Sequence, residues 1–166
     1  MFSSVEDAVV RWELYRGEVL CDRFTINQWR LMVTEIETDK EWRDFVDKYK
    51  DFVRCYILRS VSDNEEVAFV YLYNESGNFD IVSIHGGGWD RSIKSTMYYY
   101  RGLILMISSL IAEGRKVRTS CYIDNLRAFR FLRSVGFVPY MRSHTTIYMW
   151  INEKRLKNSS IYKRLK

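Results

Sequence analysis

The spacing of apolar side chains predicts short helices and strands along the chain. Between residues 25 and 50, two apolar runs recur every three to four residues, and each follows a Thr-x-x-Gln or Thr-x-x-Glu pair typical of helix starts. Two helices in tandem are therefore expected there. Residues 1–24 allow two interpretations, because Ser4-Val5-Glu6-Asp7 fits a capping box that opens a helix ending at Gly17, while Val9–Leu14 fits a strand.

The next segments predict strands. Phe52–Ser60 and Val67–Asn74 are rich in β-branched and aromatic residues, as interior strands are. A turn over residues 74–78 then leads into a returning strand over Phe79–Gly86. The remaining predicted elements are, in order, a helix over Met97–Glu113, a strand over Lys116–Tyr122, a helix over Asp124–Val135 that Gly136 ends, and closing strands over Val138–Arg142 and Thr145–Ile151.

This order of elements predicts the fold class. A single strand between two helices requires crossover connections, whereas the earlier strands follow one another as hairpins. We expect an α/β (α+β) fold with a mixed, mostly antiparallel, twisted central sheet of about six to seven strands and helices on both faces.

Composition narrows the class of protein. The chain has 166 residues, of which 47% are hydrophobic, so one folded domain over residues 1–153 is expected, followed by a tail over 154–166. No apolar run reaches the roughly 20 residues of a membrane span, and no secretory signal is visible. Cys21, Cys55 and Cys121 are odd in number and widely spaced, which fits a reducing cytoplasm. With only His85 and His144 as histidines, no metal site is expected.

The basic character of the chain belongs to its tail. Six of the 26 basic residues lie in residues 154–166, which hold no acid, so the rest of the chain carries 20 basic against 21 acidic side chains. The tail fits either an arm for a polyanion or a solvated terminal helix or frayed end. We favour the second interpretation and expect no nucleic-acid partner, because no aromatic platform or recognition helix accompanies the charge.

A basic, hydroxyl-rich turn follows the strand that ends in His85-Gly86-Gly87-Gly88-Trp89 and leads into a helix. A helix start directs unpaired N–H groups and the positive end of its dipole at one point, which favours phosphate. The residues expected to bind phosphate are Arg91, Ser92, Lys94, Ser95, Thr96 and Met97.

Two other motifs compete for this segment. His85-Gly86-Gly87-Gly88 matches an esterase oxyanion loop, but that chemistry needs a Gly-x-Ser-x-Gly nucleophile, which the chain lacks. A nucleotide P-loop would need glycine where Ile93 stands, and a β-branched residue resists the positive φ that wraps a phosphate. A solvated basic loop without a ligand is the remaining alternative.

The segment after the second crossover carries a family resemblance. Asn125-x-x-Ala128, followed eight residues after Ala128 by Gly136-Phe137, resembles the last motif of the GNAT-type N-acetyltransferases, which bind acetyl-coenzyme A. The element order agrees over residues 25–151, while the motifs are confined to 79–137. In the family's pyrophosphate loop Arg91 fits the first position, but Lys94 and Thr96 replace small residues.

The resemblance implies a cofactor slot. By this resemblance, acetyl-coenzyme A is the co-substrate, and Asn125 and Phe131 contact its pantetheine arm. Asn125 also fits the role of a helix cap, and Phe131 also fits a position in the core. It also implies that the backbone N–H groups of a splayed strand, at Val82, Ser83 and Ile84, face the thioester carbonyl.

Catalysis needs a base, because an amine of pKa about 10.4 is protonated at pH 7. His85 lies at the end of the strand and is our expected general base, with a hydrogen bond to its own glycine-rich turn as the alternative role. Leu132 occupies the place where many family members have an acidic tyrosine, so Tyr122, with Cys121 as a further option, is the expected acid. Three acidic residues between the first two helices, Glu35, Glu37 and Asp39, fit either a site that attracts the acceptor amine or a solvated acidic loop.

The predicted function is acetyl transfer from acetyl-coenzyme A to a small-molecule or peptide amine by direct attack. The alternatives are a non-catalytic coenzyme A-binding or interaction module of the same fold, with a tail that touches nucleic acid, and transfer of another acyl group. Neither the acceptor nor the oligomeric state follows from the sequence, and a homodimer stays open.

Overall fold

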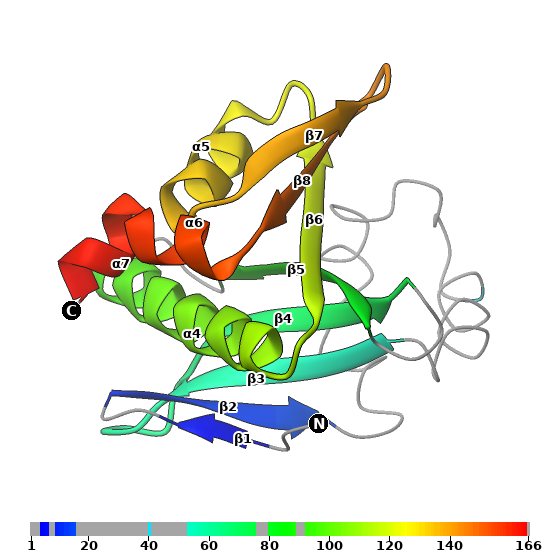
Figure 1. The fold of residues 1–166 in the computed structure, drawn as a ribbon. Helices are drawn as coiled ribbons and strands as arrows, with labels where there is room; N and C mark the ends of the chain where they lie inside the picture. Colours follow the sequence, from blue (N-terminus) through cyan, green and yellow to red (C-terminus); the bar gives the residue numbers. More distant parts are fainter. Residues whose placement is uncertain are drawn as a thin grey trace.

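The computed structural model describes residues 4–6, 9–15, 40, 53–75, 80–88 and 92–165, and its ribbon is shown in Figure 1. The elements that it contains are β1 (Ser4–Glu6), β2 (Val10–Tyr15), β3 (Val53–Ser60), β4 (Glu66–Asn74), β5 (Ile81–Gly88), α4 (Ile93–Ala112), β6 (Lys116–Tyr122), α5 (Leu126–Val135), β7 (Val138–Arg142), β8 (Thr146–Ile151), α6 (Glu153–Asn158) and α7 (Ser160–Leu165).

The strands form one sheet of eight in the order β1-β2-β3-β4-β5-β6-β8-β7. Every neighbouring pair is antiparallel except β5 and β6, which are parallel and joined by the crossover through α4. The expected class, a mixed and mostly antiparallel sheet with crossover helices, is confirmed. With the short strand β1, the described residues form eight strands, against the expected number of about six to seven.

The beginning of the chain adopts the strand interpretation. Trp12 and Val10 of β2 are fully buried and pair with Leu58 and Ser60 of β3. The helix interpretation is wrong for Ser4–Glu6 and Val10–Tyr15. Of the two tandem helices expected between residues 25 and 50, only Lys40, which is helical, lies within the described residues.

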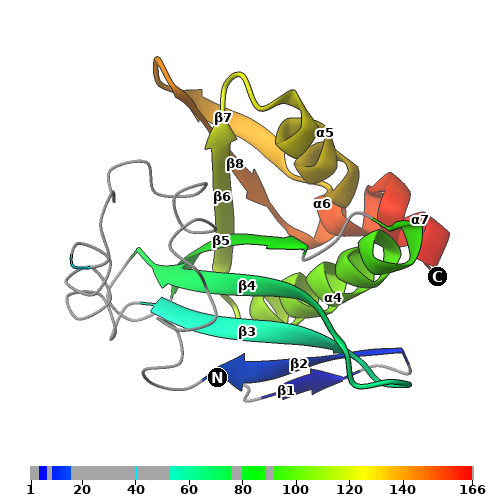
Figure 2. The same cartoon turned by 180° about the vertical axis from the view of Figure 1, so that it is seen from behind.

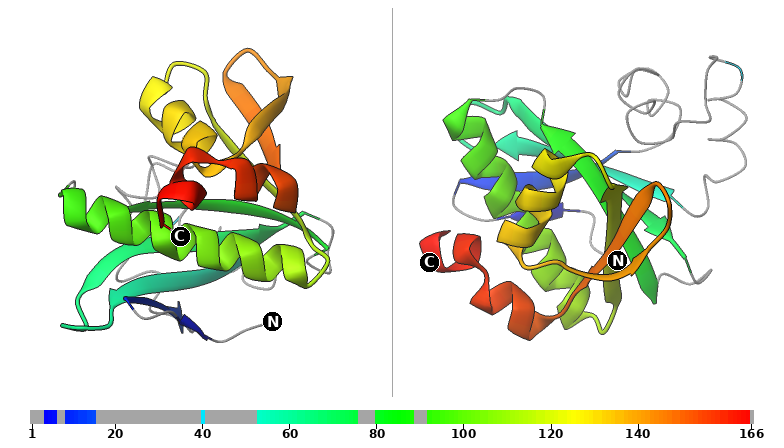
Figure 3. Two further views of the ribbon diagram at one scale, coloured as in Figure 1. Left: turned by 60° about the vertical axis from the view of Figure 1, so that its left-hand side comes forward. Right: turned by 90° about the horizontal axis from the view of Figure 1, so that it is seen from above.

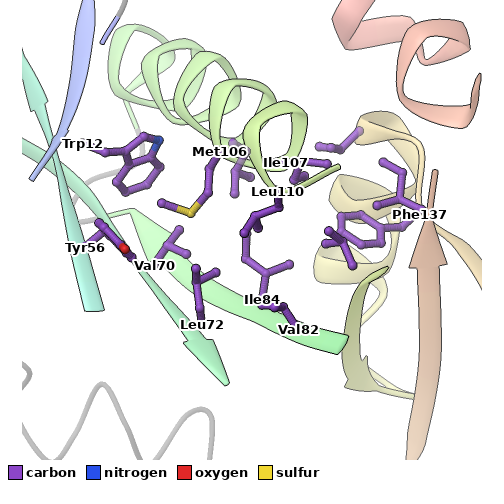
Figure 4. Packing of buried hydrophobic residues seen from close by; sticks show 14 of the residues in the cluster. Trp12, Tyr56, Val70, Leu72, Val82, Ile84, Met106, Ile107, Leu110 and Phe137 are labelled. Carbon is purple, nitrogen blue, oxygen red and sulfur yellow. The ribbon is translucent and has the colours of Figure 1, made fainter. Parts of the chain in front are cut away.

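Helix α4 covers one face of the sheet and forms the main core with it. Figure 4 shows Met106, Ile107 and Leu110 of the helix against Val82 and Ile84 of β5. Figure 2 shows the opposite face of β3, β4 and β5 from behind. That face is apolar and buried as well, at Cys55, Ile57, Phe69 and Tyr71. The side chains of β5 therefore alternate between two different environments.

The boundaries of β5 and α4 differ from the prediction in a way that concerns the site. Helix α4 begins at Ile93 instead of Met97, because the Ser92 hydroxyl caps it by accepting from the Ser95 amide at 3.1 Å. Strand β5 continues to Gly88, and its three glycines pair with Ala68, Phe69 and Val70 of β4. The glycines therefore extend a strand and do not form a turn.

The basic segment at the end of the chain packs on the rest of the fold as two short helices. Leu156 of α6 and Ile161 of α7 are buried, and Leu156 belongs to the main core. Figure 3 shows both helices beside α4 and α5. Residues 154–165 thus contain the expected terminal helix, but it packs on the core instead of standing in solvent.

Candidate active site between two splayed strands

Strands β5 and β6 pair over a short length and then diverge. Their register runs from Ile81 with Lys116 to Ser83 with Arg118, although β5 continues to Gly88 and β6 to Tyr122. In Figures 1 and 2, β6 turns away from β5 beyond this paired part. The carboxyl ends of two neighbouring strands thus separate at the end of the sheet where α4 begins.

Backbone direction along β5 alternates between β4 and β6. The carbonyl of Ile81 accepts from Glu75 at the end of β4 (3.0 Å), while the carbonyl of Ile84 accepts from the Thr119 hydroxyl of β6 (2.7 Å). Even-numbered residues of β5 therefore direct N–H and C=O toward β6, and odd-numbered residues direct theirs toward β4.

This alternation changes which amides face the separated strands. Val82 lies in the paired part, the backbone of Ser83 is directed toward β4, and Ile84 stands where the strands part. The next backbone group directed toward β6 is that of Gly86. Sequence alone does not identify Gly86 as a backbone donor, because the direction of each amide depends on which residue pairs with which neighbour.

Only glycine fits at position 86. A Cβ atom there would meet the Phe69 carbonyl oxygen and would lie 2.9 Å from both the Tyr99 hydroxyl and a Val70 methyl group. At Gly87 the nearest atoms to such a Cβ would be ring carbons of Phe69 at 3.5 and 3.6 Å, which is ordinary contact. The backbone at Gly86 is therefore closely enclosed on its α4 side.

The start of α4 holds most of the predicted phosphate residues. Ser95 and Thr96 donate their amides to the Ser92 hydroxyl and carbonyl (3.1 and 3.0 Å). Among the described residues, no acceptor meets the amides of Ile93 and Lys94. Met97 lies within the helix, and Arg91 lies outside the described residues.

The Lys94 side chain is 64% exposed and has weak partners. Its ammonium nitrogen lies 3.9 Å from an Asp63 carboxylate oxygen and 5.5 Å from the centre of the Tyr98 ring. Asp63 belongs to the turn between β3 and β4, so the turn and the helix start are close in space. Because this ion pair is long and exposed, Lys94 is available to an incoming anion.

Asn125 and Phe131 both have structural partners. Asn125 is the N-cap of α5, and its side-chain oxygen accepts from the Ala128 amide at 3.1 Å. Phe131 stacks against Tyr99 and Tyr100 of α4, with ring centres 5.3 and 4.6 Å apart. The Tyr99 hydroxyl is also the group beside Gly86, so this aromatic stack adjoins the separated strands.

His85 lies on the face of the sheet away from α4, since its neighbour Ile84 is in the core with that helix. Its Nε2 atom hydrogen-bonds to the Ser83 hydroxyl at 2.9 Å, and its ring stacks on Tyr71 with centres 5.1 Å apart. Burial lowers the pKa of His85 to about 4. The imidazole is therefore neutral at pH 7 and able to accept a proton.

Tyr122 ends β6 on the same face as His85, because it alternates with the core-facing Thr119 and Cys121. Burial raises the pKa of Tyr71, the tyrosine that stacks on His85, and the charges of Cys55 and Tyr122 raise it further. Cys121 packs against the core, and burial raises the pKa of its thiol. Tyr71 belongs to the candidate site but was not among the residues predicted from the sequence. Alternation of side chains along β4 is the signal that could have placed it on this face.

The predicted acceptor residues Glu35, Glu37 and Asp39 lie outside the described residues. Leu132 packs against the core.

In the described part of the chain, no group of three His, Cys, Asp or Glu side chains is placed to hold a metal ion. No helix in this part is long and apolar enough to cross a membrane.

Solved structures share this fold over nearly the whole chain. A chain described as apo FdhC, a nucleotide-linked sugar GNAT, aligns with a TM-score of 0.68 over 97% of this chain and 96% of its own, at 12% identity. Spermidine N-acetyltransferase from Vibrio cholerae, in complex with CoA and spermine, aligns with a TM-score of 0.66 over 92% and 100%, at 10% identity. Campylobacter jejuni N-acetyltransferase PseH, in complex with acetyl coenzyme A, aligns with a TM-score of 0.58 over 86% and 99%, at 11% identity.

No family model matches the chain, and no curated protein matches its sequence. At identities of 10–12% the structural likeness establishes the fold alone.

Proposed function

We propose that this chain, whose fold is that of the GNAT acetyltransferases, moves an acetyl group from acetyl-coenzyme A to an amine. The observation that carries the proposal is the divergence of β5 and β6 beyond Ser83 and Arg118, at the end of the sheet where α4 begins. At this end of the sheet lie the Gly86 backbone, which has no partner on β6, the exposed Lys94 and the start of α4.

The residues at this end fit the two polar parts of the coenzyme. The amides of Ile93 and Lys94 and the Lys94 ammonium would hold the pyrophosphate, with Arg91, Ser92, Ser95 and Thr96 of the same turn beside them. The backbone of Ile84 and Gly86 would pair with the pantetheine arm as a neighbouring strand does. Asn125 uses its side-chain oxygen as a cap, which leaves its amide hydrogens to donate to the arm.

The acceptor amine would approach from the face that carries His85. As its nitrogen attacks the thioester carbonyl carbon, His85 takes up the proton that the amine loses. The N–H of Gly86 or Ile84 would stabilise the negative charge that forms on the carbonyl oxygen. When the carbon–sulfur bond breaks, Tyr122 would protonate the leaving thiolate, giving an amide and free coenzyme A without a covalent acyl-enzyme.

Two observations favour a second candidate, a coenzyme-binding module without turnover. The pKa of His85, about 4, makes it a weak base at neutral pH, and Leu132 stands where many members of the family have an acid. Such a module would bind the coenzyme through the same strands and helix start but would release no thiol.

Two measurements test the proposal. Calorimetry with acetyl-coenzyme A, free coenzyme A and ATP should show binding of the two coenzymes and weaker binding of ATP. A thiol-release assay with a panel of amines then separates an enzyme from a binding module. If neither acetyl-coenzyme A nor coenzyme A gives heat, both candidates are overturned. If the coenzymes bind but no amine leads to thiol release, the enzyme is overturned and the binding module is supported.

A further inference from the structure

A cavity of about 440 Å³ lies where α4 ends, β6 begins and β8 ends. Its described lining contains three cations, Arg115, Lys116 and Arg118, and two aromatic side chains, Tyr140 and Trp150. The rest of that lining consists of apolar side chains and Asn152, with no acidic residue among the described residues that line it. A cavity of this composition suits a ligand that is flat and negatively charged.

One side of the cavity, formed by β6, leads toward the proposed active site. Lys116 and Arg118 alternate along β6 with the buried Val117, so they lie on the face of the sheet that carries His85. Arg118 is the register partner of Ser83, whose hydroxyl bonds to His85 at 2.9 Å. His85 follows Ser83 by two residues along β5, which is about 7 Å along the strand from the position that pairs with Arg118.

Arg118 is held in place by weak contacts that an anion could replace. Its guanidinium lies 3.5 Å from a Glu75 carboxylate oxygen and 5.5 Å from the centre of the Tyr140 ring. Both members of this ion pair are about one-third exposed, and such pairs contribute little to stability. A guanidinium forms two parallel hydrogen bonds with a carboxylate or phosphate, which is a stronger interaction than this one.

We propose that this cavity binds the acceptor and that the acceptor is an amine carrying an oxyanion, phosphate or carboxylate, on a planar ring. The inference rests on the proposed acetyl transfer and names the substrate class for it. Arg118 and Lys116 hold the oxyanion, and the rings of Tyr140 and Trp150 contact the planar part. The amine then lies toward His85. Glu113 pairs with Arg115 at 2.7 Å and Glu75 with Arg118 at 3.5 Å. The three cations still outnumber these two carboxylates, so a polycationic amine would meet a net positive charge there.

Four amines that differ in charge test the substrate class. Tyramine O-phosphate and 4-(2-aminoethyl)benzoate carry the two oxyanions, tyramine carries none, and spermidine carries only positive charge. The two anionic amines should show kcat/KM values about ten- to a hundredfold above that of tyramine, as expected for charge-assisted hydrogen bonds. The better of the two identifies the oxyanion. Equal values for all four amines, or a preference for spermidine, would overturn the proposal.

Variants locate the effect in the cavity. Arg118→Ala should lower the ratio of kcat/KM for the preferred anionic amine to kcat/KM for tyramine about tenfold. Arg118→Lys should retain part of the preference, and Arg164→Ala, an exposed arginine of α7, should retain all of it. A preference that is unchanged in Arg118→Ala would overturn the role of this cavity.

A binding measurement that needs no turnover separates this inference from the proposed function. Phenyl phosphate should bind the wild-type protein in calorimetry and bind Arg118→Ala about tenfold more weakly. If acetyl-coenzyme A gives no heat and no amine releases thiol, the acetyl-transfer proposal fails, while weaker phenyl phosphate binding by the variant would still support the cavity as an anion site. Equal phenyl phosphate affinity in the two proteins would overturn the site itself.

Discussion

Thr119 donates its hydroxyl hydrogen to the carbonyl oxygen of Ile84 at 2.7 Å, just beyond the last paired residues of β5 and β6. Both side chains are buried, at 4% exposure each. The hydroxyl satisfies a carbonyl that backbone pairing leaves where the strands part, so the separation does not leave a buried acceptor unpaired. One side chain thus stabilises the geometry on which the proposed coenzyme site depends.

Replacing Thr119 with Val should destabilise the protein although the two residues have nearly the same shape. The variant leaves the Ile84 carbonyl buried without its donor, which costs about 1–3 kcal/mol. Thr119→Ser keeps the hydroxyl and should lose only about 0.8 kcal/mol for the missing methyl group. Urea unfolding measures both values. Equal stability of Thr119→Val and the wild type would contradict this role of the bond.

Gly86 and Gly87 provide a matched pair of alanine substitutions. Gly86→Ala places a methyl group against the Phe69 carbonyl oxygen and the Tyr99 hydroxyl, so the strand must shift or the ring must move. We expect a lower unfolding midpoint and weaker acetyl-coenzyme A binding by calorimetry. Gly87→Ala meets only ring carbons at 3.5 Å or more and should change neither quantity much. Equal effects of the two substitutions would show that position 86 has no special role.

His85 should make the protein less stable in mild acid. Its pKa is about 4 in the folded protein, against about 6.5 in an unfolded chain, so as the pH falls the unfolded state takes up the proton first. The contribution of the neutral imidazole to the free energy of unfolding is therefore fully present above about pH 6.5. It is lost as the pH falls from there to about 4, and it does not change further at lower pH. A difference of this size corresponds to roughly 3 kcal/mol.

Urea unfolding at pH 7.5, 5.5 and 4.5 tests this expectation. The loss of stability between pH 7.5 and 4.5 should be smaller in His85→Gln than in the wild type. His144→Gln replaces an exposed histidine and should follow the wild-type profile. Parallel profiles for all three proteins would show that burial does not hold His85 neutral.

The sequence predicted the described elements well because their periodicity and caps are local properties. Gly136, with φ of 117°, ends α5 where the sequence placed its stop, and the Asn125 cap was an open alternative that the structure confirms. Helix α4 begins four residues before the start expected from the sequence. Its first turn, capped by Ser92, is basic and hydroxyl-rich and so resembles a loop in composition. Local patterns therefore located the helices better than their first turns.

The arrangement of the candidate site could not be predicted from the sequence in the same way. The family resemblance implied that β5 and β6 separate, but the direction of the Gly86 amide toward β6 depends on which residues of distant strands pair. The stack of Tyr71 on His85 and the cavity at Arg118 likewise join segments that only the sheet order brings together. The sequence identified the side chains of these contacts without showing which of them meet.

Lys94 should contribute to coenzyme binding through its charge. Lys94→Ala removes the exposed cation at the start of α4, and acetyl-coenzyme A should bind several-fold more weakly, with a smaller effect at high salt. Asp63→Asn should have the opposite effect, about twofold tighter binding at most, because it frees Lys94 from its carboxylate partner. The asparagine oxygen can still accept from the Glu65 amide, so the turn is kept.

Calorimetry at two salt concentrations measures these affinities. Lys154→Ala, in the exposed first turn of α6, is the control for a general loss of charge. If Lys94→Ala and Lys154→Ala weaken binding equally, long-range charge explains the effect and Lys94 does not contact the phosphates.

Asn125 has two roles in the proposal, and two substitutions separate them. Its side-chain oxygen caps α5, while its amide hydrogens would donate to the pantetheine arm. Asn125→Asp keeps an oxygen that can accept from the Ala128 amide and removes the donor, so the unfolding midpoint should stay near that of the wild type while acetyl-coenzyme A binds more weakly. Asn125→Ala removes both groups and should also lose about 1 kcal/mol of stability through the missing cap. Thermal unfolding and calorimetry on the same preparations give the two quantities. Unchanged coenzyme affinity in Asn125→Asp would leave Asn125 as a helix cap alone.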